Sequence, residues 1–194
     1  VRGFFEREAE QYGLAQKEPV RVDLYDRVDD LPPAYDPSSN VLSRMLWSLR
    51  LRWWAWSAGE QEGRVPPDIR VFVLFHDPTL TRQVPHSVGL QKGLLGVVHA
   101  FAHRDMIAQN NVVIAHELMH TLGATDKYDP ESGQPLFPDG YADPEQDPLH
   151  PQEQAEVMAG RRALSNSEWE MAPSLRSVVV GSLTAAEINW MERP

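Results

Sequence analysis

The spacing of apolar residues in the first part of the chain predicts two helices separated by an extended segment. Residues 4–12 place apolar side chains among Glu and Arg at helical spacing, which predicts a short helix. Residues 20–25 alternate with the two-residue period of a strand. A longer helix is predicted over residues 41–59, because Asn40 can cap its start and the Pro66-Pro67 pair bars any continuation.

Two strands and a second long helix are predicted next. Residues 68–75 are rich in β-branched and aromatic side chains, and residues 94–101 form a second apolar run, so both are predicted to be strands. Asn110 or Asn111 can cap a helix that continues through Leu122. Gly123 follows at the position where helices commonly end with a left-handed residue.

The last third of the chain has a different character. Residues 125–151 are crowded with Pro, Gly, Asp and Tyr and show neither helical nor strand periodicity, which predicts a long ordered loop. Thr184 and Glu187 have the spacing of a capping box, which predicts a short final helix ending near Met191. This order of elements predicts an α+β fold in one domain over residues 1–194, with sub-halves of about 1–123 and 124–194.

Composition and charge exclude several classes of protein. A formal net charge of -10 argues against nucleic acid as a partner, because that role needs a concentrated basic surface. The chain has no cysteine, so any metal must be held by His, Asp or Glu. No apolar run approaches the length of a membrane span. A signal or anchoring segment can precede Val1, and export to the periplasm, cell surface or medium is the location we favour.

The second long helix carries the sequence His-Glu-Leu-Met-His over residues 116–120. His116 and His120 are four residues apart, so both imidazoles project from one face and can share a single tetrahedral metal ion, for which zinc is the expected identity. Glu117 is rotated by about a third of a turn from His116, so its carboxylate can reach a metal-activated water and act as the general base without competing for the metal. The predicted reaction is therefore acyl hydrolysis.

A third protein ligand is expected, because catalytic zinc generally takes three and leaves the fourth position to water. Gly123 permits a sharp exit from the helix, and Asp126, three residues later, can return beneath the metal. Asp126 is therefore the predicted third ligand. Asp129, Asp139 and His150 lie in the same loop and are the alternatives.

The pattern His-Glu-x-x-His-x-x-Gly-x-x-Asp resembles the zinc-binding motif of metzincin peptidases, in the variant seen in snapalysin-like peptidases, where Asp replaces the usual third His. The resemblance implies a twisted mixed sheet of about five strands that carries the zinc helix, followed by a smaller, irregular C-terminal half. It also implies a Met-turn under the zinc, for which Met158 is the matching residue. In that family the edge strand before the zinc helix binds the substrate backbone, and residues 94–101 match that strand.

These features predict a zinc-dependent hydrolase, and specifically a metalloendopeptidase that acts on a peptide or protein with Glu117 as general base. Two alternatives stay open: a non-catalytic zinc-binding module of the cell envelope, and a zinc hydrolase acting on a non-protein amide. The substrate-binding residues are not identified by the sequence.

The first long helix is rich in tryptophan and arginine. We expect its tryptophans to pack on the sheet with the arginines at the margin, and membrane association of this domain is not expected. A membrane interface or a partner protein is the alternative for this helix. The residues concerned are Trp47, Trp53, Trp54 and Trp56 with Arg44, Arg50 and Arg52.

Overall fold

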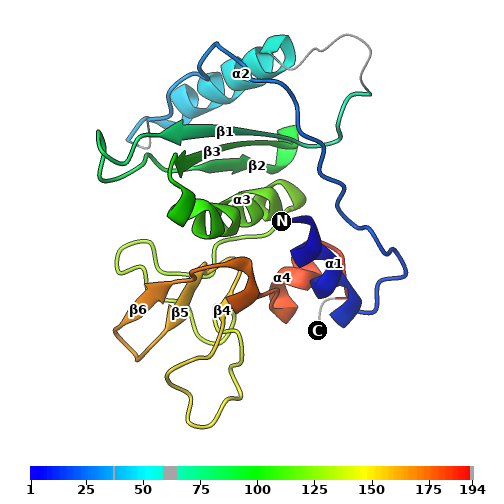
Figure 1. The fold of residues 1–194 in the computed structure, drawn as a ribbon, viewed down its shortest axis with the longest axis vertical. Coiled ribbons are helices and arrows are strands. Elements are labelled where there is room, and N and C mark those ends of the chain that lie inside the picture. The colour runs from blue at the N-terminus through cyan, green and yellow to red at the C-terminus, as the bar shows by residue number, and fades with distance from the viewer. Residues whose placement is uncertain (37, 59–64, 193–194) are drawn as a thin grey trace.

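The computed structural model describes residues 1–36, 38–58 and 65–192, and it has the predicted α+β fold (Figure 1). The described residues form four α-helices and two mixed sheets. The helices are α1 (Arg2–Gln11), α2 (Val41–Ala58), α3 (Ile107–Leu122) and α4 (Ser182–Glu187). The predicted end of α2 at Gly59 lies outside the described residues.

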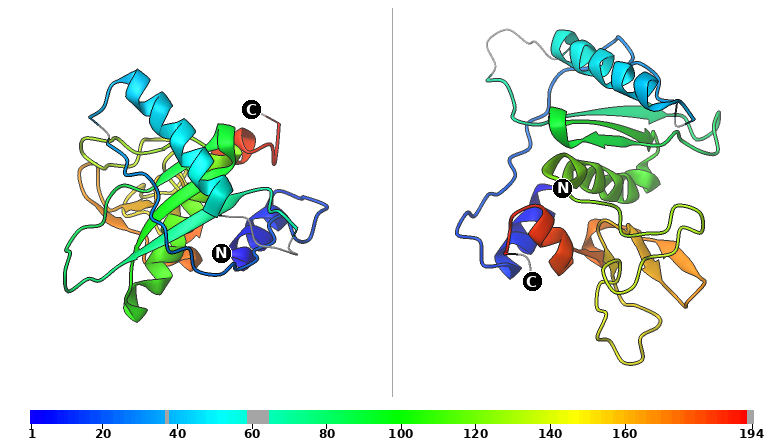
Figure 2. Two further views of the ribbon diagram at one scale, coloured as in Figure 1. Left: turned by 90° about the horizontal axis from the view of Figure 1, so that it is seen from above. Right: turned by 180° about the vertical axis from the view of Figure 1, so that it is seen from behind.

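The first sheet separates two long helices. Its strand order is β1-β3-β2, with β1 (Arg70–His76) parallel to β3 (Leu95–Phe101) and β2 (Val88–Leu90) antiparallel to β3. Helix α2 covers one face of this sheet and α3 covers the other (Figures 1 and 2). The central strand β3 is a nearly continuous apolar run because both of its faces are covered.

Two expectations about this sheet are wrong. The described residues give it three strands rather than about five, and residues 94–101 form its central strand rather than an edge. The antiparallel edge strand is β2, which is only three residues long. Such a short segment carries too little alternation to be recognised in the sequence.

The strand predicted at residues 20–25 is also absent from the described structure. This segment belongs to the connection that runs from α1 up to α2 along the outside of the molecule (Figure 1). Its alternating pattern is compatible with an extended chain, but a strand also needs a neighbouring strand. The hydroxyl of Tyr25 instead donates to the carbonyl of Val65 at 2.9 Å.

The second sheet lies in the lower half of the molecule. Its order is β6 (Trp169–Met171), β5 (Arg161–Ala163), β4 (Ala155–Glu156) and β7 (Val178–Val179). Residues 125–151 form the predicted irregular loop, in which the described pairing is limited to isolated bridges. Short 3-10 turns precede β3, α3 and β7, at Gln91–Gly93, Arg104–Met106 and Leu175–Ser177.

Helix α1 packs against the C-terminal elements rather than against the first sheet. The ring of Phe5 meets that of Trp190 edge-on at 6.2 Å between centroids. The hydroxyl of Tyr12 donates to the carbonyl of Val180 at 2.6 Å, and the fully buried Glu8 carboxylate accepts from the Val180 N–H at 2.8 Å. The beginning and the end of the described chain therefore close the lower half together.

Both predicted helix caps in the second half of the chain are wrong. Helix α3 begins at Ile107, so Asn110 lies inside it. The Asn110 amide donates to the Phe101 carbonyl at 2.9 Å and accepts from the Phe101 N–H at 3.2 Å, which joins α3 to the end of β3. Helix α4 begins at Ser182, and the Thr184 hydroxyl donates to Glu156 at 2.7 Å. In both cases a polar side chain suited to capping makes a tertiary contact instead.

Candidate metal centre

Helix α3 and the turn after it bring three predicted ligands together. His116 and His120 project from the last two turns of α3, and Gly123 ends the helix with a φ of 112°. The chain then returns so that Asp126 Oδ1 lies 3.1 Å from His116 Nε2 and 3.2 Å from His120 Nε2. The two Nε2 atoms are themselves 3.1 Å apart. These three side chains form a group that can hold a metal ion.

The size of this triangle fits a small transition-metal ion. For Zn–N and Zn–O bonds of about 2.0–2.1 Å in tetrahedral geometry, neighbouring donor atoms lie about 3.3 Å apart. The observed separations of 3.1 to 3.2 Å are close to that value. The Asp126 side chain is 47% exposed, so the group opens toward solvent on the side of this ligand.

The other ring nitrogen of each histidine meets a backbone carbonyl. Nδ1 of His116 lies 3.0 Å from the Val157 oxygen, and Nδ1 of His120 lies 2.8 Å from the Ala124 oxygen. A carbonyl only accepts, so each Nδ1 carries a proton, and a metal ion would take the place of any proton on Nε2. Backbone carbonyls thereby fix the ring orientation and tautomer that metal binding needs.

The charges in the triangle favour a cation at its centre. Burial alone would raise the pKa of Asp126, but hydrogen bonds from His116 and His120 outweigh it and hold that pKa far below its ordinary value. Burial alone would lower the pKa of His120, but the hydrogen bond to Asp126 and the nearby charge of Glu117 raise it. The carboxylate therefore stays ionised, and a proton and a metal ion compete for the same nitrogen atoms.

Glu117 lies beside this group in an unusual state for a carboxylate. The residue is 6% exposed, and its Oε2 atom is buried without a hydrogen-bond partner among the described residues. Burial raises the pKa of Glu117, although the two neighbouring histidines act in the opposite direction. An orphaned carboxylate oxygen beside three metal-binding donors fits a site that receives a water molecule.

Gly89, on the edge strand β2, lies directly against this carboxylate and was not singled out by the sequence. Its backbone N–H lowers the pKa of Glu117, against the effect of burial. A Cβ atom at this position would lie 2.4 Å from the Glu117 carbonyl oxygen and 2.6 Å from His120 Cβ. Only glycine lets the edge strand approach the helix so closely.

The predicted Met158 lies in a turn that supports His116. Met158 is fully buried, and the turn from Val157 to Gly160 supplies the carbonyl that His116 contacts. The carboxylate of Glu156 holds this turn: it is completely buried and accepts from the N–H groups of Met158 and Ala159.

Glu156 also accepts from Gly181 N and from the Thr184 hydroxyl, so it ties the turn to the start of α4. Burial raises the pKa of Glu156, although the hydrogen bonds from these four donors act in the opposite direction. The sequence signal for this residue is a lone acidic side chain between Ala155 and Val157, both of them apolar, inside a short strand.

An aromatic and basic pair lies next to the triad. The Tyr128 ring is 6.5 Å from the His116 ring, and the Arg161 guanidinium lies 3.9 Å from the centre of the Tyr128 ring. Burial and the charge of Asp126 raise the pKa of Tyr128, so its phenol stays protonated at neutral pH. Its position two residues after Asp126 is the only hint of this residue in the sequence.

The alternative third ligands are elsewhere. Asp129 accepts hydrogen bonds from Glu131 and Ser132 within its own turn. His150 Nε2 lies 3.0 Å from the Tyr141 hydroxyl, and Asp139 is exposed to solvent. In the part of the chain that the structure describes, Asp126 is the loop residue that joins the two histidines.

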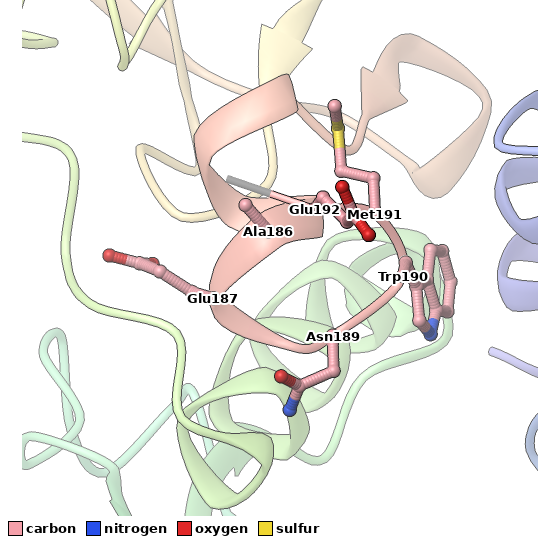
Figure 3. A pocket seen from close by; sticks show the side chains of 6 residues that line it. All are labelled: Ala186, Glu187, Asn189, Trp190, Met191 and Glu192. Atoms are coloured by element: carbon pink, nitrogen blue, oxygen red, sulfur yellow. The ribbon is translucent and has the colours of Figure 1, made fainter. Parts of the chain in front are cut away.

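An open hollow beside α4 is a less suitable site. It has a volume of about 660 Å³, and in Figure 3 the side chains of Glu187, Asn189 and Met191 diverge rather than converge on a common point. Its lining includes no histidine and none of the three triad residues. The metal-binding group therefore remains the best candidate for a functional site.

Comparison with protein-family models, curated proteins and solved structures gives no match to this chain. The resemblance to metzincins therefore remains a prediction from the motif. The structure establishes an α+β protein with a His-His-Asp group that can hold a metal ion.

Proposed function

We propose that this protein is a zinc-dependent metallopeptidase whose ligands are His116, His120 and Asp126. The observation that carries the proposal is the buried, unpartnered Oε2 of Glu117 beside the triad. A structural metal site fills its coordination shell with protein ligands and does not require an unpartnered carboxylate beside them. A hydrolytic site, in contrast, needs a general base at this position.

When bound, zinc would supply an acidified water and would polarise the carbonyl group of the substrate. Glu117 accepts one proton from the attacking water as the water oxygen bonds to the carbonyl carbon. The same carboxyl group then donates that proton to the leaving nitrogen as the carbon–nitrogen bond breaks. Burial raises the pKa of Glu117, which makes its carboxylate a stronger base toward the attacking water.

Tyr128 is proposed to stabilise the negative charge that develops on the carbonyl oxygen. Its raised pKa keeps the phenolic hydrogen available as a donor. The guanidinium of Arg161 over its ring holds the side chain in place and adds positive charge to this side of the site. Together, Tyr128 and Arg161 would supply the hydrogen-bond donor and the positive charge that stabilise the oxyanion formed during amide hydrolysis.

The proposed substrate is an extended peptide bound along β2. In the described residues β2 pairs only with β3, so its other edge offers backbone groups for antiparallel strand addition. Gly89 brings this strand against Glu117 and His120, so an added strand would pass close to the triad. Main-chain pairing would hold the substrate without selecting its side chains, which suits an endopeptidase.

The test begins with the metal. Purified protein is expected to contain about one zinc ion per chain by elemental analysis. Removing the metal with a chelator is expected to abolish peptide hydrolysis, and adding zinc back is expected to restore it. The His-His-Asp ligand set also occurs at non-haem iron, so finding iron instead would overturn the zinc assignment.

Glu117→Gln tests the base. It is expected to lower the rate of peptide cleavage by about 10² to 10⁴ while zinc stays bound. Glu131→Gln, on the exposed surface of the following loop, is the matched control and should leave the rate unchanged. Zinc binding without cleavage of a mixed peptide library by the wild type would favour the non-catalytic module, and cleavage that survives Glu117→Gln would remove the general base.

A further inference from the structure

Helix α2 is apolar on two sides, and only one side is used by the fold. On the inner side Leu51 and Ala55 are buried against β3 residues of the first sheet, and the Trp54 ring lies 4.5 Å from that of Phe72. Trp47 packs against the same buried cluster, and its ring N–H donates to the Pro33 carbonyl at 2.8 Å. The expectation that the tryptophans pack on the sheet is therefore met by Trp47 and Trp54 and is wrong for Trp53 and Trp56, which are exposed.

The outer side of α2 carries a continuous exposed apolar stripe. Trp53 is 70% exposed and Trp56 is 57% exposed, and four aliphatic or thioether side chains precede them along the same side. Five stripe positions follow a spacing of four and three residues, which keeps them on one face of a helix. The stripe consists of Leu42, Met45, Leu46, Leu49, Trp53 and Trp56.

The charges on α2 are opposite in sign to those of the whole chain. Between Val41 and Ala58 there are three arginines and no acidic residue. The chain has 18 basic and 28 acidic residues, so the remainder has 15 basic against 28 acidic and a formal charge of -13. At 100° per residue, Arg50 and Arg52 lie about 80° to either side of the centre of the stripe.

We propose that this outer face of α2 docks on the surface of an anionic lipid bilayer. Tryptophan is favoured at the boundary between headgroups and acyl chains, and arginines flanking an apolar stripe can reach lipid phosphates while their stems stay in apolar surroundings. A second copy of the same face is a poorer occupant, because two such helices would bring four arginines together, Arg50 and Arg52 of each copy, with no acidic residue on the helix.

The helix would lie on the bilayer, not across it. Within the described residues no helix has the length and apolar character needed to span a membrane. The acidic remainder of the chain would be repelled by an anionic surface, which restricts contact to α2 and sets the orientation of the protein. Binding should therefore weaken as salt screens the arginine contribution.

Docking through α2 would place the metal centre away from the lipid. The first sheet lies between α2 and α3, the helix that carries His116 and His120, in Figure 1 and in the right view of Figure 2. Two layer spacings of about 10 Å each give a separation of roughly 20 Å. The site would then face the water layer next to the membrane rather than the membrane itself.

Co-sedimentation of the purified protein with vesicles tests this proposal. We expect binding to vesicles of phosphatidylcholine with one-third phosphatidylglycerol, and little binding to pure phosphatidylcholine. The Trp53→Ala, Trp56→Ala double variant should bind at least tenfold more weakly. Arg50→Gln should weaken binding about fivefold. The matched control is the double variant Leu136→Ala with Phe137→Ala, which removes two exposed apolar side chains outside α2. It should bind as the wild type does.

Folding of each variant is checked by circular dichroism and by retained metal content. Because the changed side chains are exposed, all variants are expected to fold as the wild type does. The proposal is overturned if the wild type does not bind anionic vesicles, or if the double tryptophan variant binds them with the same affinity as the wild type. It is also overturned if the wild type is a dimer by light scattering and the same double variant is a monomer, because a second copy would then cover the stripe.

Discussion

Helices α2 and α3 cover opposite faces of one three-stranded sheet, yet their environments differ. Helix α3 has protein on both sides, and it buries polar groups such as Glu117 and Asn110. Helix α2 has protein on one side, buries only Leu51 and Ala55, and exposes apolar side chains on the other. Burial of the unpartnered Glu117 oxygen on α3 and exposure of apolar groups on α2 both cost stability, and both therefore point to function.

The largest effect on metal affinity should come from removing the third ligand, which the turn after α3 supplies. Asp126→Asn is expected to weaken zinc binding more than about a hundredfold, because it takes away a charged donor from the triad. Competition with a chromogenic chelator measures the affinity. Asp129→Asn, in the same loop, should leave the affinity unchanged. Equal losses in both variants would mean that the loop, not the Asp126 carboxylate, determines binding.

The loop that carries Asp126 is tied to α4 by a buried ion pair, and breaking it should cost about 3–5 kcal/mol. Lys127 Nζ lies 2.8 Å from Glu187 Oε2, and the two side chains are 4% and 11% exposed. Glu187→Gln is the variant, and its free energy of unfolding is measured in denaturant. The exposed pair of Arg162 and Glu170 is the control, because Glu170→Gln should cost less than about 1 kcal/mol.

The same ion pair gives stability a defined pH dependence. Burial alone would raise the pKa of Glu187, but its hydrogen bonds with Lys127 and Thr125 lower it below 4.5. A carboxyl group with a lowered folded pKa contributes stability that is complete above its unfolded pKa and is lost as the pH falls through the folded value. The difference between wild type and Glu187→Gln should therefore shrink below about pH 4.5. A constant difference down to pH 3 would contradict the ion pair.

Asn110→Ala should have the next largest effect, about 2 kcal/mol of lost stability. The substitution leaves both the N–H and the carbonyl of Phe101 without the side-chain partner that they have in the folded protein. Asn111→Ala, one residue further along α3, is the matched control and should change stability by less than about 0.5 kcal/mol. If the two variants were equally stable, the hydrogen bonds between Asn110 and Phe101 would not contribute to the stability of the fold.

The smallest effect is expected on the outer side of α2. Leu49 is 59% exposed, so Leu49→Ala should change the free energy of unfolding by less than about 0.5 kcal/mol. Leu51, two residues away, is 1% exposed, and Leu51→Ala should cost about 2–5 kcal/mol. Thermal or denaturant unfolding compares the two. A large loss for Leu49→Ala would show that the stripe is covered by the protein itself.

The sequence predicts the parts of this protein that depend on local spacing. The four-residue separation of His116 and His120 predicts their shared helix face, and Gly123 predicts the left-handed end of α3. The return of Asp126 to the histidines follows from that turn. Each of these features is determined within a few residues, so periodicity and turn chemistry are enough to predict it.

What the sequence does not predict depends on residues that are far apart. Asn110 and Thr184 have the character of helix caps, but Phe101 and Glu156 take their side chains. The three residues of β2 are too few to show a period, although Gly89 is the point where that strand meets the site. Likewise, no local pattern distinguishes a tryptophan of α2 that packs inward from one that faces outward.

The contacts of Glu8 also bear on how the protein is made. This carboxylate in α1 is buried against the N–H of Val180, 172 positions later in the chain. At a synthesis rate of 5–20 residues per second, α1 leaves the ribosome roughly 10 to 30 s before that partner exists. Glu156, which organises the turn beside His116, likewise waits for Gly181 and Thr184. The turn that contacts His116 is therefore held in place only after Gly181 and Thr184 have been synthesised.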